Sequence, residues 1–274
     1  MFKIKRIIFP LLFIFLIKAE VFAQNKIQVL ILTGRQNHRW ELTTPALKQM
    51  YIKSGRFDVE VSLSPDTIKQ GDLFKYNVIV NNWNDYPEND TKWPKDTEDA
   101  INDFVKMGGG IVFFHASSTA FYDWPEFHQM AGGTWRDNVT RHGRPHTFEV
   151  KISDVDHPIT RGMKGFTTTD ELWVNTVITG EPEILATAFA SAQNRGAEKD
   201  EPMVFCTHFG KGRGYYIALG HDVAAIENLG FQTLMLRGTE WAATNKVRIP
   251  IPDELRIADK STSKQSSRGS TKKD

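Results

Sequence analysis

The sequence has a single cysteine, Cys206, so no disulfide can form within the chain. It also lacks the H-E-x-x-H motif of zinc proteases and the G-x-S-x-G motif of serine hydrolases. The glycines of segment 210–214 have G-x-G-x-G spacing, but an apolar strand follows them instead of the helix that a dinucleotide site needs. These absences argue against a disulfide scaffold, two familiar hydrolytic mechanisms and a nucleotide cofactor.

No apolar run is long enough to span a bilayer, which takes about 20 residues. The longest run, residues 7–17, follows Lys3, Lys5 and Arg6, and Val21 and Ala23 lie at the small-residue positions of a cleavage site. This pattern predicts a secretory signal peptide over residues 1–23. We therefore expect a periplasmic or secreted protein with no membrane span after processing.

Residues 24–259 have no excess of basic side chains. The formal net charge of +1 becomes about −2 without residues 1–23, and the segment 260–274 holds five of the remaining positive charges. An acidic body argues against nucleic acid as a partner. Residues 248–274 are predicted to be a polar, disordered tail, which leaves one domain over residues 24–247.

Strands and helices alternate in the first half of that domain. Apolar runs predict strands at 26–34, 57–63, 76–83 and 110–115, and capping and periodicity predict helices at 43–55 (with Thr43 or Thr44 as N-cap) and 93–109. The second half is richer in strands, predicted at 146–152, 171–174, 183–190, 202–209 and 212–220, before a last helix at 230–244. This order predicts an α/β three-layer sandwich with a mostly parallel sheet and a strand-rich C-terminal extension.

Three histidines stand where predicted strands end. His38 follows the first strand, His115 ends the fourth and His221 follows the last. Ligands of parallel α/β sheets bind outside the carboxyl ends of the strands, so these imidazoles are expected to meet in one site. They could bind a zinc-like divalent metal, with His142 or His208 as a further ligand. Metal-free acid–base chemistry and a structural or ligand-binding arrangement remain open.

Two neighbouring carboxylates, Asp170 and Glu171, are candidate catalytic residues together with His115 and His221. On a strand, adjacent side chains point to opposite faces, so Asp170 and Glu171 cannot form a glycosidase pair by themselves. Asp170 is the expected partner that orients a ligating histidine from behind.

Tryptophans and polar residues near strand ends are candidate substrate-binding residues, because flat aromatic rings suit the CH faces of sugars. Trp40 and Trp83 follow strand ends, and Asn82 and Asp85 could bind hydroxyl groups. Arg213 completes the predicted substrate-binding residues. Trp173 and Trp241, in contrast, are expected to fill the core.

Other polar residues are expected to have structural roles. His157, in the segment D-V-D-H-P-I-T, is predicted to lie in a turn, and His128 to pack on a short helix. Asp222 is predicted to cap the helix that follows it.

Four segments together resemble a known family. They are T-G-R-Q-N-H-R-W at 33–40, G-G-G-I-V-F-F-H-A-S-S at 108–118, the pair D-V-D-H-P-I-T and T-T-T-D-E-L-W, and P-M-V-F-C-T-H-F-G-K-G-R-G-Y-Y-I-A-L-G-H-D at 202–222. Over residues 27–243 the chain is similar to the trehalose-utilisation (ThuA-like) family, which has the class I glutamine amidotransferase-like fold. In that fold the resemblance puts His115 in the place of the catalytic cysteine and His221 in the place of the histidine.

The resemblance implies carbohydrate chemistry without a thiolate. Cys206 lies inside a predicted strand, away from His115, so a thioester intermediate is excluded and the protein is not a glutaminase. The implied function is an exported enzyme that acts on a keto-sugar or a disaccharide derivative by histidine-based or metal-assisted acid–base chemistry. A non-catalytic sugar-binding domain and a metal-dependent amide or ester hydrolase are the alternatives.

Overall fold

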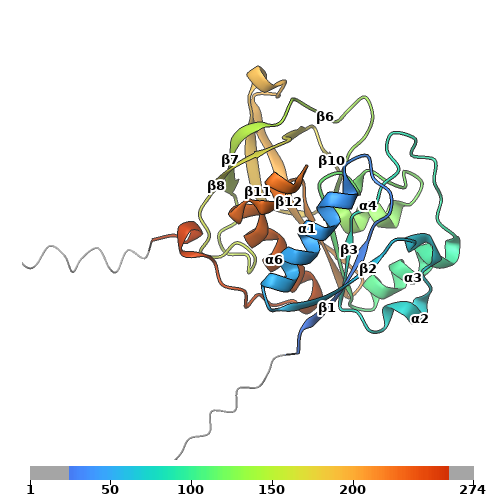
Figure 1. The fold of residues 1–274 in the computed structure, drawn as a ribbon. Helices are drawn as coiled ribbons and strands as arrows, with labels where there is room; N and C mark the ends of the chain where they lie inside the picture. The colour runs from blue at the N-terminus through green and yellow to red at the C-terminus, as the bar shows by residue number, and fades with distance from the viewer. Residues whose placement is uncertain (1–24, 259–274) are drawn as a thin grey trace, which may run out of the picture.

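The structure, a computed structural model, describes residues 25–258 (Figure 1). The predicted signal peptide and residues 259–274 of the predicted tail lie outside the described residues. Within residues 25–258, no helix has both the length and the apolar composition to cross a bilayer.

One large sheet organises the described residues. Its nine strands are β1 (Ile27–Leu32), β2 (Phe57–Ser62), β3 (Val78–Asn81), β4 (Gly110–Phe114), β7 (His146–Ile152), β8 (Phe166–Asp170), β11 (Glu183–Ala190), β12 (Lys199–Phe209) and β13 (Gly212–Ile217). They lie in the order β2-β1-β3-β4-β13-β12-β11-β7-β8. In this spatial order the five strands from β2 to β13 are parallel to one another. Each pairing from β13 onward to β8 is antiparallel. Two small sheets pair β5 (Gly133–Thr134) with β10 (Val177–Ile178) and β6 (Arg141–His142) with β9 (Trp173–Val174).

Helices cover both faces of the large sheet. They are α1 (Trp40–Lys53), α2 (Gln70–Leu73), α3 (Lys95–Lys106), α4 (Pro125–Ala131), α5 (Val223–Glu227) and α6 (Leu229–Thr244), with 3-10 turns η1 (Pro65–Thr67), η2 (His115–Ser118), η3 (Ala192–Asn194) and η4 (Asp253–Leu255). Figure 1 shows α1 and α6 on the near side of the sheet. Neighbouring residues of β13 face opposite layers, since the Tyr215 hydroxyl donates to Leu234 of α6 while Gly214 lies against Met130 of α4. The predicted α/β sandwich with a strand-rich second half is confirmed.

The strands form where the sequence is continuously apolar. All five residues of β4 are buried, as expected for a central strand covered on both faces. The start of α1 differs from the prediction: the helix begins at Trp40, so Thr43 and Thr44 lie inside it. Neither threonine is the N-cap, because the Thr44 hydroxyl instead contacts the hydroxyl of Thr33 and accepts a hydrogen bond from Asn82, which ties α1 to the sheet.

The domain extends beyond the predicted boundary at residue 247. Ile251 and Leu255 are buried, and Leu255 accepts a hydrogen bond from the Lys164 amide at 2.8 Å. The Ile257 amide donates to Gly162 at 2.9 Å. The prediction of a disordered tail from residue 248 is therefore wrong for residues up to 257, since two apolar side chains anchor this segment to the body.

Candidate metal centre

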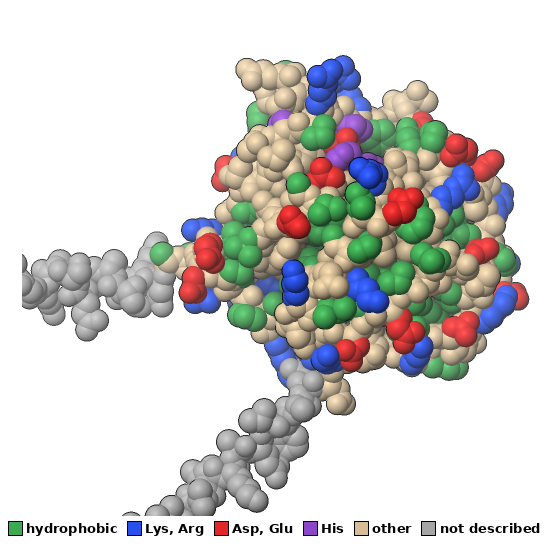
Figure 2. Space-filling model, viewed as in Figure 1, with side chains coloured by type: hydrophobic (Ala, Val, Ile, Leu, Met, Phe, Trp, Pro, Cys, Tyr) green, Lys and Arg blue, Asp and Glu red, His purple; other side chains and the backbone are tan. Residues whose placement is uncertain are grey.

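The three histidines at strand ends meet above the sheet. His38 lies in the loop between β1 and α1, His115 follows β4 directly, and His221 follows β13. The ring centroids are 4.6 Å apart for His38 and His115, 4.8 Å for His38 and His221, and 5.3 Å for His115 and His221. Figure 2 shows histidine side chains gathered in one place on this face of the molecule. The parallel arrangement of β1, β4 and β13 brings these residues together, because their carboxyl ends share one edge.

His115 occupies a strained turn at the end of β4. Its φ of +43° lies in the left-handed region, which is uncommon for a residue with a side chain. Two hydrogen bonds hold the turn: the Phe114 amide donates to the Ser117 hydroxyl at 2.9 Å, and the Tyr216 hydroxyl donates to the His115 carbonyl at 3.2 Å. These bonds hold His115 in a conformation that costs about 1 kcal/mol.

The partners of two ring nitrogens fix the orientation of their imidazoles. Nδ1 of His115 donates to the Ala218 carbonyl at 3.0 Å, and Nδ1 of His38 donates to the Asn37 side-chain oxygen at 3.1 Å. In the neutral rings both Nε2 atoms then carry lone pairs, and these atoms face each other at only 3.2 Å. Two lone pairs at this distance repel unless a proton or a metal cation lies between them.

Glu171 and His221 complete the cluster. Glu171 Oε2 lies 3.5 Å from His115 Nε2 and 3.3 Å from His221 Nδ1. The buried His221 Nδ1 has no hydrogen-bond partner among the described residues. One ligand atom from each of His38, His115, Glu171 and His221 lies within 4.8 Å of all the others. Ligands about 2.0–2.1 Å from a tetrahedral zinc ion are about 3.3 Å from one another, so the three contacts of 3.2, 3.3 and 3.5 Å have the spacing of metal ligands.

The charges in the cluster also suit a cation. Burial, together with His115 and His221, lowers the pKa of His38 to about 3. Burial alone would raise the pKa of Glu171, but its contacts with His115 and His221 hold that pKa well below the usual range. At neutral pH the cluster therefore offers the neutral imidazole of His38 and the ionised carboxylate of Glu171, which are the forms that bind metals, whereas the contact with Glu171 raises the pKa of His221.

Asp170 holds this centre in place from outside it. Its carboxylate accepts hydrogen bonds from the amides of Gly220 at 2.7 Å, Glu171 at 2.8 Å and His221 at 3.2 Å. Burial raises the pKa of Asp170, and the three amides work against that rise. These bonds engage both of its oxygens and give Asp170 a supporting role, and its predicted catalytic role stays a prediction. It positions His221 through the backbone and not through the ring.

Glu171 was predicted from the sequence as a catalytic residue but not as a metal ligand. β8 ends at Asp170, so Glu171 lies beyond the strand and is free to turn toward the histidines. A strand end between the two acidic residues was the signal that could have identified it. His142, a further candidate, lies beside the cluster: its Nδ1 is 3.4 Å from Glu171 Oε1.

Three of the predicted substrate-binding residues are internal supports. Trp83 packs between Trp93 and Phe121, with centroids 5.1 and 5.0 Å away. Asn82 is fully buried against α1, and the buried Asp85 accepts a hydrogen bond from the Thr91 amide at 2.8 Å. The prediction that these side chains bind substrate is wrong, because none is exposed to a ligand at the centre.

Arg213 and His208 lie at the other end of the sheet. The Arg213 guanidinium donates to the carbonyls of Trp241 and Ala242 at 3.1 and 3.0 Å, near the C-terminus of α6. His208 is exposed, with its ring 5.8 Å from that of Trp241. Neither can reach the cluster, because both lie at the amino ends of β4 and β13. The predictions that Arg213 binds substrate and that His208 is a ligand are therefore wrong.

Two hollows open on either side of the cluster. We call the smaller one, of about 90 Å³, the aromatic hollow; it is lined by Asn37, His38, Tyr86, Ala116, Thr119, Trp135, His142, Glu171 and Trp173. The helix hollow, of about 460 Å³, is lined by Asn37, His38, Arg39, Leu42, Thr43, His221, Asp222, Val223 and Ala224. Trp40 lines neither of them, whereas Trp173, expected only in the core, forms part of the aromatic hollow. Asp222 caps α5, as predicted, by accepting from the Ala225 amide.

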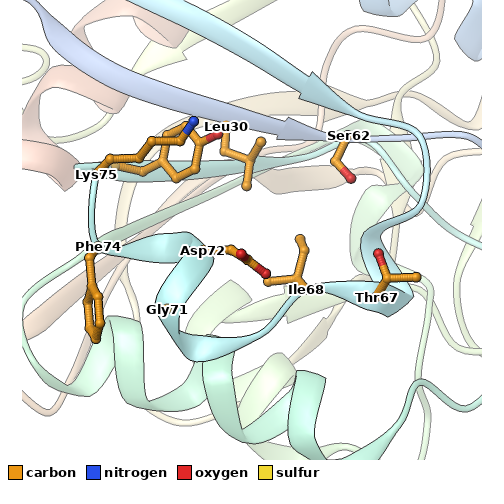
Figure 3. A pocket seen from close by; sticks show the side chains of 9 residues that line it. Leu30, Ser62, Thr67, Ile68, Gly71, Asp72, Phe74 and Lys75 are labelled. Carbon is orange, nitrogen blue, oxygen red and sulfur yellow. The ribbon is translucent and has the colours of Figure 1, made fainter.

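A larger hollow, of about 530 Å³, lies away from the histidines, beside β1, β2 and α2 (Figure 3). Its charged side chains already have partners: Asp72 accepts from the Lys69 amide, and Lys75 pairs with Glu60. Neither histidine nor cysteine lines it. Volume alone therefore does not mark the functional site here, and the metal-binding chemistry is confined to the strand ends.

Comparisons with known proteins agree with this architecture. The family model described as trehalose utilisation (ThuA) matches residues 28–242. The solved structure of a ThuA-like protein from Parabacteroides merdae is 31% identical, with a TM-score of 0.75, over 85% of this chain and 95% of that one. A ThuA-like protein from Bacteroides uniformis is 19% identical, with a TM-score of 0.64, over 82% and 96% of the two chains.

More distant structures share the fold alone. A cytoplasmic protein from Salmonella typhimurium is 15% identical, with a TM-score of 0.56, over 80% of this chain and all of that one. No curated protein matches the chain.

Proposed function

Because this chain belongs to the trehalose-utilisation (ThuA) family, we propose that it is an exported, metal-dependent enzyme of carbohydrate utilisation. In this proposal His38, His115, Glu171 and His221 bind one divalent cation, and the substrate is an oxidised (keto) sugar or disaccharide derivative. The observation that carries the proposal is the pair of Nε2 atoms 3.2 Å apart, with the Glu171 carboxylate beside them. The family description supports the sugar, and the pattern of residues 1–23 supports export.

A cation at this centre would polarise the carbonyl of a keto-sugar and make the neighbouring C–H bonds more acidic. Glu171 and His142 are placed to move the proton, because they lie 3.4 Å apart in the wall of the aromatic hollow. Proton abstraction beside a carbonyl leads to elimination or isomerisation. His115 is 2% exposed, so its ring would serve to hold the cation and not to exchange protons with solvent.

Metal analysis of the freshly purified protein tests the proposal. We expect about one equivalent of a divalent transition metal, lost in His115→Ala and in His221→Ala. His208→Ala is the matched control, because His208 lies at the far end of the sheet and should keep the metal. Absence of metal from the wild-type protein, even after incubation with zinc, manganese or cobalt salts, would rule out the metal mechanism.

A second function, a non-catalytic sugar-binding domain, is favoured by the number of ligands. Four protein ligands can fill a tetrahedral zinc shell and leave no position for substrate, as in structural zinc sites. Cobalt substitution separates the two functions through the visible spectrum. A tetrahedral spectrum that added keto-sugar does not change supports the binding domain, whereas a spectrum that shifts on addition supports the enzyme.

A further inference from the structure

Trp173 carries a buried indole N–H that has no acceptor. The residue begins β9 and is 2% exposed, and its Nε1 has no hydrogen-bond partner among the described residues. Trp124, which is 3% exposed, shows the usual arrangement, because its Nε1 donates to the Asn102 side-chain oxygen at 3.2 Å. A buried donor without a partner loses its bond to water and gains none in return. An acceptor that the described residues do not supply is therefore expected at Trp173.

Two further side-chain donors of the aromatic hollow already have acceptors in the protein. Nε1 of Trp135 donates to Asp137 Oδ1 at 3.1 Å, and the Thr119 hydroxyl donates to the Ala116 carbonyl at 2.9 Å. Trp173 lines the same hollow as Trp135 and Thr119. Of these three donors, only the Trp173 N–H is left for a molecule bound in the hollow.

The acceptor that Trp173 needs has the chemistry of an oxygen atom and not of a metal ion. An indole nitrogen donates a hydrogen bond and has no lone pair for a cation. The candidate metal centre has the opposite need, because the Nε2 atoms of His38 and His115 face each other at 3.2 Å. An oxygen of a bound ligand satisfies both needs, since its lone pairs can face a cation and an N–H at once.

The position of the Trp173 ring places this oxygen beside the centre. The ring centroid lies 5.3 Å from that of His115 and 5.1 Å from that of Trp135. Glu171, two residues earlier in the chain, lines the aromatic hollow together with Trp173. Because the ring is otherwise packed against protein, the aromatic hollow is the space in which a ligand oxygen can reach it.

The indole is held in place before any ligand binds. Trp173 pairs with His142 across the small sheet of β9 and β6, and its neighbours Leu172 and Val174 are buried. A side chain that is fixed in this way loses little conformational freedom when it gains a partner. A fixed donor also stabilises negative charge that develops on an oxygen during a reaction, because it needs no reorganisation.

We propose that Trp173 binds the reacting oxygen of the substrate: its Nε1 donates a hydrogen bond to the carbonyl oxygen that also faces the metal centre. The carbonyl is then polarised from two sides, by the cation and by the N–H. Only the carbonyl end of the molecule has to enter the hollow of about 90 Å³. This inference rests on the proposed function, because it takes the substrate to be a ketone that reacts at the centre.

Nuclear magnetic resonance of the protein with isotope-labelled tryptophan tests this contact directly. The chain has seven tryptophans, and Trp173→Phe identifies the Trp173 indole signal by its absence. The probe is dihydroxyacetone, a three-carbon keto-sugar, and its control is glycerol, which has the same carbon chain without the carbonyl. We expect dihydroxyacetone to move the Trp173 indole proton downfield, with a shift that saturates, and glycerol to leave it in place.

The same substitution at two positions separates the unpaired N–H from the aromatic ring. Trp173→Phe should weaken dihydroxyacetone binding about tenfold, because the donor is lost while an aromatic ring remains. Trp135→Phe is the matched control, since the Trp135 N–H already donates to Asp137 and is not available to the probe. It should leave the affinity unchanged. The Trp135 signal follows the titration of the first variant, and the Trp173 signal follows that of the second.

The inference is overturned if dihydroxyacetone leaves the Trp173 signal in place, since a buried water would then be the acceptor. It is also overturned if glycerol causes the same shift, or if both variants lose the same affinity. If Trp173→Phe does not fold, backbone assignment of the wild-type spectrum identifies the same signal, and the wild-type titration decides.

Metal content of the same samples separates failure of this inference from failure of the proposed function. A protein that holds metal while its Trp173 signal does not respond to the probe keeps the metal centre and loses the assigned donor. A protein whose Trp173 signal responds without metal keeps the donor and loses the metal mechanism.

Discussion

Histidines lie at both ends of the large sheet, but their surroundings differ. At the carboxyl ends, His38, His115 and His221 turn ring nitrogens toward one another and toward Glu171. At the amino ends, His157 and His208 pack their rings against Trp241, with centroids 5.1 and 5.8 Å away. The same residue type thus builds a candidate metal site at one end and part of the packing at the other. The comparison teaches that the partners of the ring nitrogens identify a site, whereas the number of histidines does not.

Trp241→Ala should produce the largest loss of stability among the five changes. Its direct effect should be limited to the amino ends of the parallel strands. Trp241 is 3% exposed, so its removal leaves a cavity and lowers the free energy of unfolding by about 3–5 kcal/mol. Chemical denaturation measures this loss. Metal content at 20 °C should remain that of the wild type; a protein that loses its metal while still folded would show that the two ends are coupled.

Glu171→Gln tests the carboxyl end by changing one ligand without changing its size. The neutral amide cannot offer a charged oxygen to the cation, so metal affinity should fall by more than about a hundredfold, beyond the range known for residues that only support ligands. A competition titration with a metal-binding dye measures the affinity. Glu201→Gln, a buried glutamate of β12, is the matched control and should leave the affinity unchanged.

Removal of the metal should destabilise the protein only through loss of the centre at the carboxyl ends of the parallel strands. At a free metal concentration a hundred times the Kd, binding adds about 2.7 kcal/mol of stability, which corresponds to about 5–10 °C in melting temperature for a chain of this size. Thermal melting with and without a chelator measures the difference. It should persist in His208→Ala and vanish in His115→Ala; an equal response in both variants would mean that the chelator acts elsewhere.

Asp170→Asn should weaken the centre less than loss of a ligand. The new side chain keeps one oxygen, so it can still accept from part of the set formed by the amides of Gly220, Glu171 and His221. Metal affinity should fall about 10–100-fold, as is usual for residues that orient ligands. The same dye titration applies. A drop as large as that of Glu171→Gln would indicate that Asp170 binds the cation directly.

Of the five changes, Arg213→Ala should have the smallest effect, and it should leave the metal affinity unchanged. Its guanidinium supports the last carbonyls of α6, so the free energy of unfolding should fall by about 1 kcal/mol. Denaturation measures this change. Weaker sugar binding in this variant would restore Arg213 as a substrate-binding residue, against its position in the structure.

Much of the fold followed from local patterns in the sequence. The strands β7 and β11 have the predicted bounds, and α6 begins one residue before the predicted helix. Such patterns work because apolar continuity and helix caps act over a few residues. The α1 start was missed because the hydroxyl of Thr44 bonds to residues remote in sequence, which local reasoning cannot see.

The sequence by itself determined that three histidines stand at the ends of parallel strands, because a strand end is a local property and parallel strands share an edge. Only the tertiary structure decided which other groups join them. Glu171 reaches the cluster and Asp170 supports it from behind because β8 ends between them. Arg213, Asn82 and Asp85 were assigned to the site by type, but their partners lie far away in the chain or inside the core. Ligand sets depend on distances of a few ångströms between remote segments, and packing, not local sequence, fixes those distances.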